Sequence, residues 1–462
     1  MRSALVYGLA VTGAATVRAL HRRGVEVRVV DDSGDRRRQD LATDLGVELV
    51  VAPDADALDR LVAAADVVVP APGVPESHPL FAAAAAAGRP VVGELELAYG
   101  WEQERPDGPR PMLAITGTDG KTTTTFLAVE MLRAGGRRAV AAGNTDVPLV
   151  EAVDDADADV FVVECASFRL ASTERFRAEA AAWLNLAEDH LNWHTSMASY
   201  EAAKARIFDQ QRPTDVAVGF AGDPVVMAHL RAAPGRRRTF GLTDADYRVE
   251  GSGAHQQLVG PDGPFADVAG MPRSLPHDLT NALAAAALVL ETGLAGPPAV
   301  AAALAGFAAP PHRIELVGDA GGVRWYNDSK ATTPHAASTA IRGFDHVVLI
   351  AGGLNKGLDL GPMAAEAARV RGVVAIGQAA DDVAAAFAGR VPVTTADSMA
   401  DAVERAGDLA TPGDVVLLSP GCASFDWYPE GGYPARGDDF RRLVQERLAV
   451  PSIPPTVAGG AT

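Results

Sequence analysis

Cysteine is nearly absent from the 462-residue sequence, which contains only Cys165 and Cys422. Two cysteines cannot build the disulfide network of a small secreted protein, so a reducing compartment is favoured. Basic residues are also in deficit, because 41 lysines and arginines face 59 acidic residues and give a net charge of −18. This balance argues against nucleic acid or an anionic membrane as the main partner. An anionic small substrate remains possible, because a local cluster of cations can act within an acidic protein.

Long hydrophobic runs are missing as well. No uninterrupted, strongly apolar stretch reaches about 18 residues, so we expect no membrane insertion. The apolar residues 4–17 could pass for a signal peptide, but Gly8 and Gly13 interrupt them and a second apolar run follows at residues 25–30. This order favours a strand, a turn, a helix and a second strand. We therefore expect a cytoplasmic protein, and a monomer.

The sequence does contain a regular alternation of short Val-rich runs and Ala-rich, helix-favouring segments. This pattern is typical of α/β domains with parallel sheets. Hydrophobic residues make up 48% of the chain, which is enough to form sizeable cores. We expect a helix at residues 81–87 and strands at residues 67–69, 112–116, 159–164, 183–186, 347–351, 373–377 and 415–419.

Two stretches are predicted to be linkers. Residues 101–111 are polar and rich in Pro and Gly, and residues 308–312 read AAPPH. With about 150 residues per domain as a guide, the chain has room for three domains. We expect domains at residues 1–105, 106–309 and 310–462, with a frayed tail at residues 451–462.

The strongest motif is GTDGKT, at residues 117–122, between an expected strand and a helix. Glycines at this point let backbone amides approach phosphate oxygens. Lys121 can supply a charge to the terminal phosphates, and Thr122 or Thr123 can offer a hydroxyl to Mg²⁺. The alternative is a tight turn with an incidental lysine. The expected nucleotide contacts in this segment are Gly117, Thr118, Asp119, Gly120, Lys121, Thr122 and Thr123.

Three further charged or titratable residues stand near predicted strand ends or on a helix. Glu164 closes a Val-rich strand in VVECASFRL, His190 follows the next expected strand, and Lys204 lies on a predicted helix. A carboxylate at a strand end suits Mg²⁺, which prefers hard oxygen ligands. Taken singly, such a histidine is more often structural, and such a lysine more often lies on a solvated face.

The order of these motifs resembles the Mur ligases, which form amide bonds with ATP in peptidoglycan precursor synthesis. The resemblance extends from about residue 4 to about residue 440. It implies a Rossmann-like N-terminal domain that binds a UDP-sugar, a central P-loop-type ATPase domain with a parallel sheet, and a Rossmann-like C-terminal domain that binds an amino acid. It also implies two Mg²⁺ sites and a carbamate on Lys204. The implied metal ligands are Thr122, Glu164, His190 and the modified Lys204, and the implied catalytic residues are Lys121, His190, Lys204 and Lys330.

Two more segments match nucleotide-binding patterns of this family. HDLTN, at residues 277–281, is similar to H-N-x-x-N, with Asn281 kept and Asp278 in place of asparagine. PHRIE, at residues 311–315, is similar to P-H-R-x-E, and the resemblance places Arg313 at a nucleotide phosphate. Asp119 also departs from the family pattern, because the family motif GTNGKT has asparagine at this position.

The C-terminal third carries the segments that the resemblance assigns to the acceptor. In NDSKAT, Asp328 would bind at the nucleotide, while Lys330 would face the reacting groups. A lysine in AGGLNKG together with C-A-S is typical of the D-glutamate-adding members. A dicarboxylate needs a cationic or hydroxyl donor for each carboxylate. The expected amino-acid contacts are Thr332, Lys356, Ser424 and Tyr433.

The N-terminal segment VYGLAVTG, at residues 6–13, is a degraded G-x-G-x-x-G. Alone, it could belong to an NAD-dependent oxidoreductase, although nothing else in the chain indicates hydride chemistry. The resemblance instead implies UDP-sugar contacts at Val11, Thr12, Asp31, Pro72, Gly73 and Asn144.

The expected reaction follows from the resemblance. ATP would phosphorylate the carboxylate of UDP-N-acetylmuramoyl-L-alanine, and the amine of D-glutamate would then attack the acyl phosphate. Two alternatives stay open: a sibling ligase with L-glutamate or another amino acid as acceptor, and a non-catalytic nucleotide-binding protein on the same fold.

Overall fold

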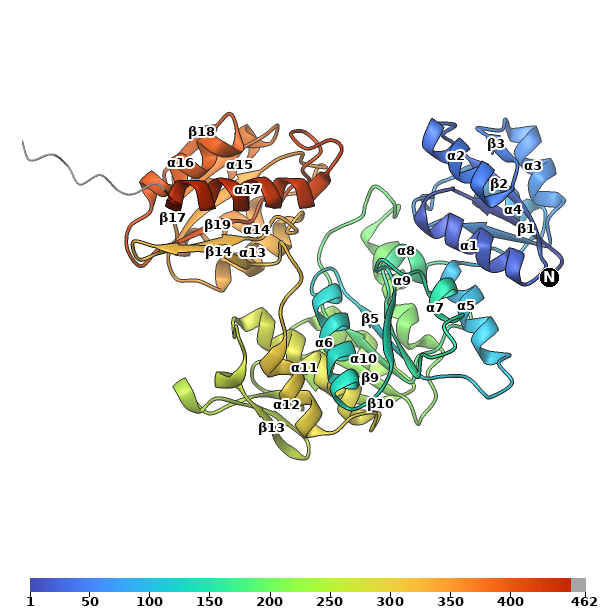
Figure 1. Cartoon of the computed structure of the whole chain (residues 1–462), viewed down its shortest axis with the longest axis horizontal. Coiled ribbons are helices and arrows are strands. Elements are labelled where there is room, and N and C mark those ends of the chain that lie inside the picture. Colours follow the sequence, from blue (N-terminus) through green and yellow to red (C-terminus); the bar gives the residue numbers. More distant parts are fainter. Residues whose placement is uncertain (450–462) are drawn as a thin grey trace, which may run out of the picture. The chain divides into compact units, whose positions relative to one another are not determined.

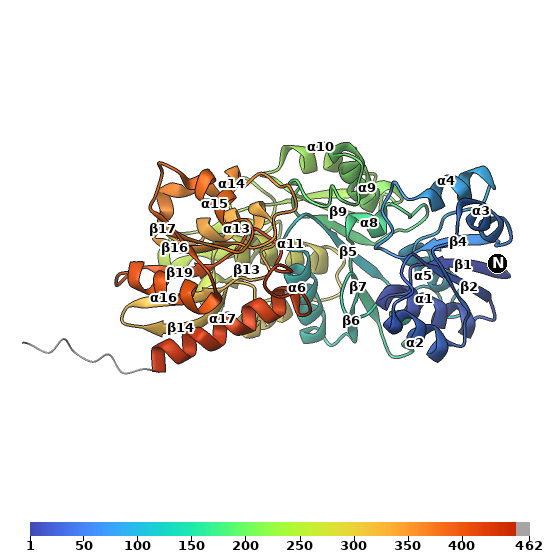
Figure 2. The same ribbon diagram turned by 90° about the horizontal axis from the view of Figure 1, so that it is seen from above.

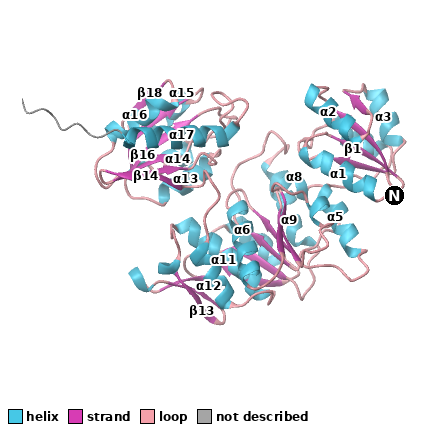
Figure 3. Cartoon of the chain, in the orientation of Figure 1, coloured by secondary structure: helices cyan, strands magenta, loops and turns pink. Residues whose placement is uncertain are grey.

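The computed structural model describes residues 1–449, and the expected frayed tail, residues 451–462, lies outside them. The chain forms two compact units, residues 1–308 and a second unit that begins at residue 309 (Figure 1). Both contain mostly parallel sheets covered by helices (Figure 3), which confirms the predicted α/β class. No helix among residues 1–449 is long and apolar enough to span a membrane.

The first sheet, at the N-terminus, has four parallel strands in the order β3-β2-β1-β4. Its strands are β1 (Ser3–Tyr7), β2 (Glu26–Asp31), β3 (Leu49–Val51) and β4 (Val67–Pro70). The intervening helices are α1 (Val11–Arg22), α2 (Arg36–Leu45) and α3 (Ala55–Ala63). Helix α4 (Pro79–Ala86) confirms the predicted alanine-rich helix, and α5 (Glu94–Gln103) follows it.

The second sheet has six parallel strands in the order β10-β9-β8-β5-β7-β6. They are β5 (Met112–Thr116), β6 (Ala139–Gly143), β7 (Val160–Glu164), β8 (Ala180–Trp183), β9 (Val216–Phe220) and β10 (Arg236–Phe240). Helices α6 (Lys121–Ala134) and α11 (Pro276–Glu291) lie side by side (Figure 2), and their apolar side chains pack with one face of this sheet.

Several shorter elements complete this unit. Helices α7 (Leu149–Ala152), α8 (Ser167–Leu170) and α9 (Met197–Asp209) belong to the segments between β6 and β9. Helices α10 (Pro224–Ala232) and α12 (Pro297–Gly306) occur later in the unit. An antiparallel sheet of β11 (Arg248–Glu250), β12 (Gln257–Gly260) and β13 (Gly263–Asp267) was not predicted from the sequence.

The strand expected at residues 183–186 is wrong in its bounds, because β8 covers Ala180–Trp183. Its three alanines favour helices in isolation. In the folded chain β8 lies between β5 and β9 and all four of its residues are buried, so tertiary packing decides its conformation.

The stretch expected as a polar linker, residues 101–111, contains a buried ion pair. Arg110 donates to both carboxylate oxygens of Glu102, each at 2.8 Å, and also to the carbonyl of Val153 at 2.7 Å. The side chains of Arg110 and Glu102 are almost completely buried. This segment is therefore anchored to the part of the chain that follows it.

The C-terminal unit has a six-stranded sheet in the order β14-β15-β19-β16-β17-β18, in which only β14 is antiparallel to its neighbour. Its strands are β14 (Glu315–Ala320), β15 (Val323–Asn327), β16 (Val347–Gly352), β17 (Val370–Ile376), β18 (Val393–Ala396) and β19 (Val415–Leu418). Its helices are α13 (Pro334–Arg342), α14 (Gly361–Ala364), α15 (Ala380–Phe387), α16 (Met399–Leu409) and α17 (Gly432–Ala449).

Candidate functional site

Three neighbouring strands of the central sheet, β7, β5 and β8, end beside one another. Ile115 of β5 pairs with Glu164 of β7, and Thr116 pairs with Trp183 of β8. The glycine-rich segment, Glu164 and the segment that leads to His190 therefore leave the sheet at the same edge. Ligands of α/β proteins bind at this carboxyl edge.

Asn185, which follows β8, fixes the backbone of the glycine-rich segment by hydrogen bonds. The side-chain oxygen of Asn185 accepts from the amides of Thr118 and Asp119, each at 2.9 Å. These two amides were expected to bind nucleotide, and they are engaged within the protein instead. Among the described residues, no partner is recorded for the next four amides, at residues 120–123, which begin α6. Free amides at a helix N-terminus are suited to bind an anion.

Gly120 shows why the motif needs a glycine. Its φ of +83° lies in the left-handed region, and a Cβ atom would come within 2.6 Å of the side-chain oxygen of Asn281. Asn281 itself receives a hydrogen bond from the Thr124 hydroxyl at 3.3 Å. The expected nucleotide contact Asn281, on α11, thus lies directly against the glycine-rich turn.

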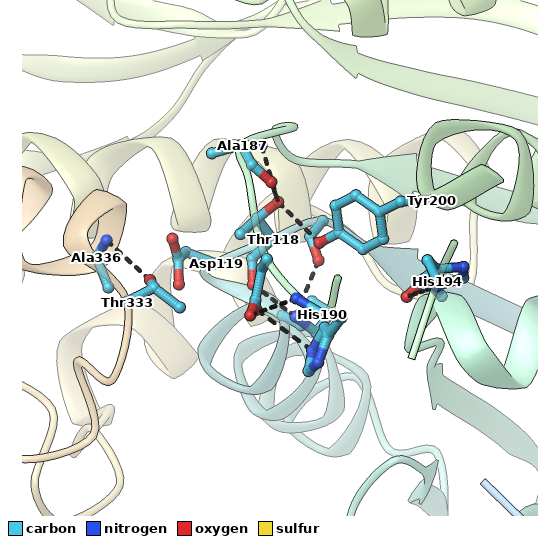
Figure 4. Close-up of polar contacts among 12 residues, drawn as sticks. Thr118, Asp119, Ala187, His190, His194, Tyr200, Thr333 and Ala336 are labelled. Atoms are coloured by element: carbon cyan, nitrogen blue, oxygen red, sulfur yellow. Dashed lines mark hydrogen bonds and ion pairs between the residues drawn. The ribbon is translucent and has the colours of Figure 1, made fainter. Parts of the chain in front are cut away.

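The hydroxyl of Thr118 connects this turn with the segment before His190. It donates to the carbonyl of Ala187 at 3.1 Å and lies 3.0 Å from the hydroxyl of Tyr200 on α9 (Figure 4). Burial raises the pKa of Tyr200, so its phenol stays protonated and donates to Thr118. The Thr118 side chain therefore supports the site and is not free for a nucleotide.

Lys121 and Lys204 donate to the same backbone oxygen. The ammonium of Lys121 lies 2.9 Å from the carbonyl oxygen of Gly117, and the amine of Lys204 lies 2.7 Å from it. Lys204 is 1% exposed. Burial, together with the neighbouring charge of Lys121, lowers the pKa of Lys204 well below its usual value. The arrangement favours a neutral amine at position 204.

Glu164 leaves one oxygen for a cation. One of its carboxylate oxygens accepts from the side chain of Asn144 at 2.9 Å, whereas the other is buried and has no hydrogen-bond partner. A buried carboxylate oxygen without a partner is costly, and a bound cation would satisfy it. The residues present therefore fit Mg²⁺. Within residues 1–449 no group of three or more His, Cys, Asp and Glu side chains forms a complete metal site.

His190 is held in an unusual backbone conformation, with φ of +56°. Its ring lies edge-on to Phe168, and its Nε2 atom is 3.3 Å from a carboxylate oxygen of Asp189. Burial lowers the pKa of His190 to about 4, and the neighbouring positive charge of Lys121 acts in the same direction. His190 is therefore neutral at physiological pH, which is the state that binds a metal ion.

Asp278, which stands in place of the family's asparagine, is engaged by protein groups. Its carboxylate accepts from the guanidinium of Arg273 at 2.7 and 2.6 Å and from the amide of Leu275 at 3.0 Å. It thus caps α11, and its charge is paired with Arg273. The departure consequently places no uncompensated negative charge beside the nucleotide segment.

Apart from Asn144, which follows β6, the expected UDP-sugar contacts lie at the start of α1, at the end of β2 and in the turn after β4. Val11 is 61% exposed and Thr12 follows it in the first turn of α1. Asp31 is buried, and its carboxylate accepts from the amides of Leu9 and Ser33, so it shapes the turn before α1. Pro72 accepts from the indole of Trp193 at 2.9 Å, and the space beside Gly73 is open.

In the C-terminal unit, the three expected acceptor segments also follow adjacent strands, β15, β19 and β16. Asp328 accepts from the Ser419 hydroxyl at 2.8 Å. Leu354 and Ala423 form an antiparallel bridge, which brings the segment of Lys356 beside that of Ser424. The ammonium of Lys330 lies 3.9 Å from the ring centre of Tyr433. Lys356 is exposed.

Arg436 on α17 joins two of these segments. Its guanidinium donates to the hydroxyl and carbonyl of Ser329, each at 2.9 Å, and to the carbonyls of Cys422 and Ala423 at 3.1 and 3.2 Å. Arg436 is 1% exposed. It fixes the segment that carries Lys330 and Thr332 against the segment that carries Ser424. Arg313, expected at a nucleotide phosphate, is partly buried near the start of this unit.

Sequence reasoning missed four of the residues that organise the site: Asn185, Tyr200, Arg436, and Arg169 on α8, which donates to Glu94, Thr12 and Asn144. Tyr200 could have been found from its spacing, because a residue four positions before Lys204 lies on the same helix face. The other three act through contacts between segments that are far apart in the sequence. No local sequence pattern indicates such contacts.

We predict that Arg436→Met lowers the free energy of unfolding of the C-terminal unit by about 3 kcal/mol or more, because buried acceptors lose their donors. Urea unfolding, followed by the fluorescence of the tryptophans, measures this change. Arg442→Met, on the same helix, is the matched control, since its pairs with Asp439 and Glu446 are exposed. It should cost far less than Arg436→Met, because exposed ion pairs contribute little to stability. Equal losses in the two variants would contradict the role given to Arg436.

Comparison with known proteins gives matches along most of the chain. Residues 2–93 match the MurD-like N-terminal domain of Mur ligases, residues 115–289 the Mur ligase middle domain, and residues 312–422 the Mur ligase glutamate ligase domain. The UDP-N-acetylmuramoylalanine–D-glutamate ligase of Frankia casuarinae is 45% identical, with 96% of this chain and 94% of the relative covered. The enzyme of that name from Myxococcus xanthus is 40% identical, with 96% and 97% covered.

Solved structures show the same fold at much lower identity. The UDP-N-acetylmuramate–alanine ligase of Thermotoga maritima is 18% identical with a TM-score of 0.59, and the alignment covers 97% of this chain and 100% of that structure. The MurF ligase of Thermotoga maritima in complex with ADP is 15% identical with a TM-score of 0.59, covering 96% and 98%.

Proposed function

This chain belongs to the Mur ligase family, and we propose that it joins D-glutamate to UDP-N-acetylmuramoyl-L-alanine at the expense of ATP. The observation that carries the proposal is the meeting of Lys121, Lys204 and the orphaned oxygen of Glu164 at one edge of the central sheet. The relatives' names supply the acceptor and the donor.

The proposed reaction has two steps. The terminal phosphoryl group of ATP passes to the carboxylate of the donor, which gives ADP and an acyl phosphate. The amine of D-glutamate then attacks the acyl carbon, the amide bond forms, and inorganic phosphate leaves with the bonding electrons as the amine loses a proton.

The nucleotide's phosphates are bound by the start of α6. Four amides without protein partners and the ammonium of Lys121 meet there, and both favour negative charge. Phosphoryl transfer needs positioning and charge stabilisation more than acid–base chemistry. These groups, already in place before the nucleotide binds, supply both.

Glu164, His190 and the hydroxyl of Thr122 would hold Mg²⁺, which would offset the negative charge of the phosphates. Lys204 would contribute to a second Mg²⁺ site as a carbamate. The neutral amine favoured by burial is the form that adds CO₂, and the product is a carboxylate-like oxygen ligand. His190 is neutral for the reason given above and needs no proton loss to bind a metal ion.

The acceptor binds in the C-terminal unit. Lys356 and Ser424, on paired segments, can hold one carboxylate of glutamate. Arg436 binds the segment that carries Thr332 and so keeps it beside them. Lys330, on the segment that Arg436 holds, would face the acyl phosphate.

Lysine occurs in the sequence only at proposed site residues. It contains four lysines in all, Lys121, Lys204, Lys330 and Lys356, and each is one of the proposed site residues. Arginine provides positive charge everywhere else in the chain. Because arginine cannot lose its proton or form a carbamate readily, retention of lysine at these four positions supports roles that need a compact or reactive amine.

We further propose that the protein acts in the cytoplasm as a monomer. The cytoplasmic location is inferred from the substrates, which are soluble anions. Sedimentation at several protein concentrations tests the second.

The substrates are tested by ATP-dependent phosphate release with UDP-N-acetylmuramoyl-L-alanine and a panel of D- and L-amino acids. We expect release with D-glutamate and at least about 100-fold less with L-glutamate, since a site with two anchored carboxylates discriminates by placing the amine. Release with L-glutamate alone would show a sibling ligase. No release with any acceptor would indicate a non-catalytic nucleotide-binding protein.

The role of Lys204 is tested by Lys204→Ala and Lys204→Arg. We expect both to lower kcat by about 100-fold or more, the size of a lost charge-stabilising group. Arginine keeps a positive charge but cannot become the carbamate, so equal losses are the expected result. Addition of a short carboxylate should restore part of the activity of the alanine variant only. Full activity of Lys204→Arg would contradict the carbamate.

A further inference from the structure

The segment that follows β4 and the segment that follows His190 hold one another by hydrogen bonds. The amide of Glu76 donates to the carbonyl of Trp193 at 3.1 Å, and the indole of Trp193 donates to the carbonyl of Pro72 at 2.9 Å. One of these segments leaves the first sheet, and the other lies between β8 and β9 of the central sheet. The two sheets are therefore connected close to a proposed metal ligand.

The carboxylate of Glu76 binds the start of α9. Its Oε2 atom accepts from the Ser199 hydroxyl at 2.9 Å and from the amide of Thr195 at 3.3 Å, and Nδ1 of His194 lies 3.4 Å from the same oxygen. A negative charge near a helix N-terminus is favourable, because the free amides there carry partial positive charge. Glu76 thus anchors the first turn of the helix on which Lys204 lies.

His194 extends this contact into the interior. Its ring is buried, and its Nε2 atom lies 2.9 Å from the hydroxyl of Ser167, which begins α8 three residues after Glu164. The ring also packs against Tyr200, which in turn packs edge-on against the ring of His190 (Figure 4). Through this histidine, the contacts of the carboxylate reach the segments of two proposed metal ligands.

The backbone of His190 needs such support. Its φ of +56° is uncommon for a residue other than glycine, and a conformation of this kind persists only where the surrounding structure imposes it. Before the residue, the carboxylate of Asp189 accepts from the amide of His190 at 2.7 Å. After it, the carbonyl of His190 accepts from the amides of Trp193 and His194, each at 2.9 Å. Glu76 binds the far end of this turn.

We propose that Glu76 is a positioning residue for the Mg²⁺ site. It acts through the turn at residues 190–194 and through the start of α9, and it touches neither the metal ion nor a substrate. The proposal rests on the metal ligands assigned under the proposed function. None of the sequence motifs contains Glu76, because its role depends on segments that only the fold brings together.

The first test measures the binding of Mn²⁺ alone, without nucleotide or turnover, by the EPR signal of the free ion. Mn²⁺ takes the same kinds of ligand as Mg²⁺. Glu76→Ala should raise the Kd for Mn²⁺ about 10-fold, at the low end of the losses caused by groups around metal ligands. Glu76→Gln should give a smaller rise, because the amide keeps the length of the side chain and one acceptor oxygen.

The second test needs no metal ion. Hydrogen–deuterium exchange of the amides at residues 190–199 shows how firmly this part of the chain is held. In Glu76→Ala, which loses hydrogen bonds to a charged acceptor, exchange there should be faster by about 10-fold or more. The amides of β5, in the middle of the central sheet, should keep their exchange rates.

Glu151→Ala is the matched control. Glu151 also joins the two parts of this unit, because its carboxylate on α7 lies 3.0 Å from the guanidinium of Arg18 on α1. Its side chain is 32% exposed, against 36% for Glu76. This ion pair includes neither the turn at residues 190–194 nor α9. The control should keep the parent's Kd for Mn²⁺ and its exchange at residues 190–199, and thermal unfolding midpoints show whether each variant is folded.

An unchanged Kd for Mn²⁺ in Glu76→Ala would overturn the proposal, even with faster exchange, because Glu76 would then support the fold and not the metal site. Equal losses in Glu76→Ala and Glu151→Ala would overturn it as well. A parent protein that binds no Mn²⁺ would refute the assigned metal ligands together with this role. Failure of the ligase reaction with the Mn²⁺ difference intact would contradict the proposed acceptor chemistry and leave the role of Glu76 standing.

Discussion

The shared carbonyl of Gly117 is the interaction on which the site depends. Two amines, those of Lys121 and Lys204, donate to this one oxygen, and Lys204 is buried. Burial disfavours the charged form of Lys204, and the neighbouring ammonium of Lys121 disfavours it further, so the pKa of Lys204 is lowered. One lysine then remains a cation for phosphate, while the other becomes a neutral amine that can react with CO₂. The burial of Lys204 thus separates the roles of two lysines that share one backbone acceptor.

The rest of the first unit keeps this oxygen in place. Asn185 binds the two amides that follow Gly117, and the hydroxyl of Thr118 is held between Ala187 and Tyr200. The same edge of the sheet provides Glu164, one of whose carboxylate oxygens is buried without a hydrogen-bond partner among the described residues. The −18 net charge makes such local order necessary, because the whole protein repels the anionic substrates and only fixed local donors can bind them.

The sequence predicts those features of the fold and the site that depend on a single segment of the chain. Val-rich strands and the glycine-lysine turn have local signals, and parallel strands carry their loops to one edge. The strand at Ala180–Trp183 was misplaced because its alanines favour helices and only burial makes it a strand. Asp278 departs from the family pattern, and only the folded structure shows that Arg273 compensates its charge. Arg169 and Arg436 act by joining distant segments, so their roles required the folded structure.

Lysine-selective NMR tests the central claim most directly, because the chain has four lysines and each gives a separate signal. The side-chain carbon next to each amine is titrated in buffer free of CO₂, and the Lys204 signal is assigned with Lys204→Arg. Lys204 should titrate well below the ordinary lysine value of about 10.4. Its pKa should rise in Lys121→Gln and stay the same in Lys356→Gln, since Lys356 is exposed and belongs to the other unit. An ordinary pKa for Lys204, or one indifferent to Lys121, would contradict the account.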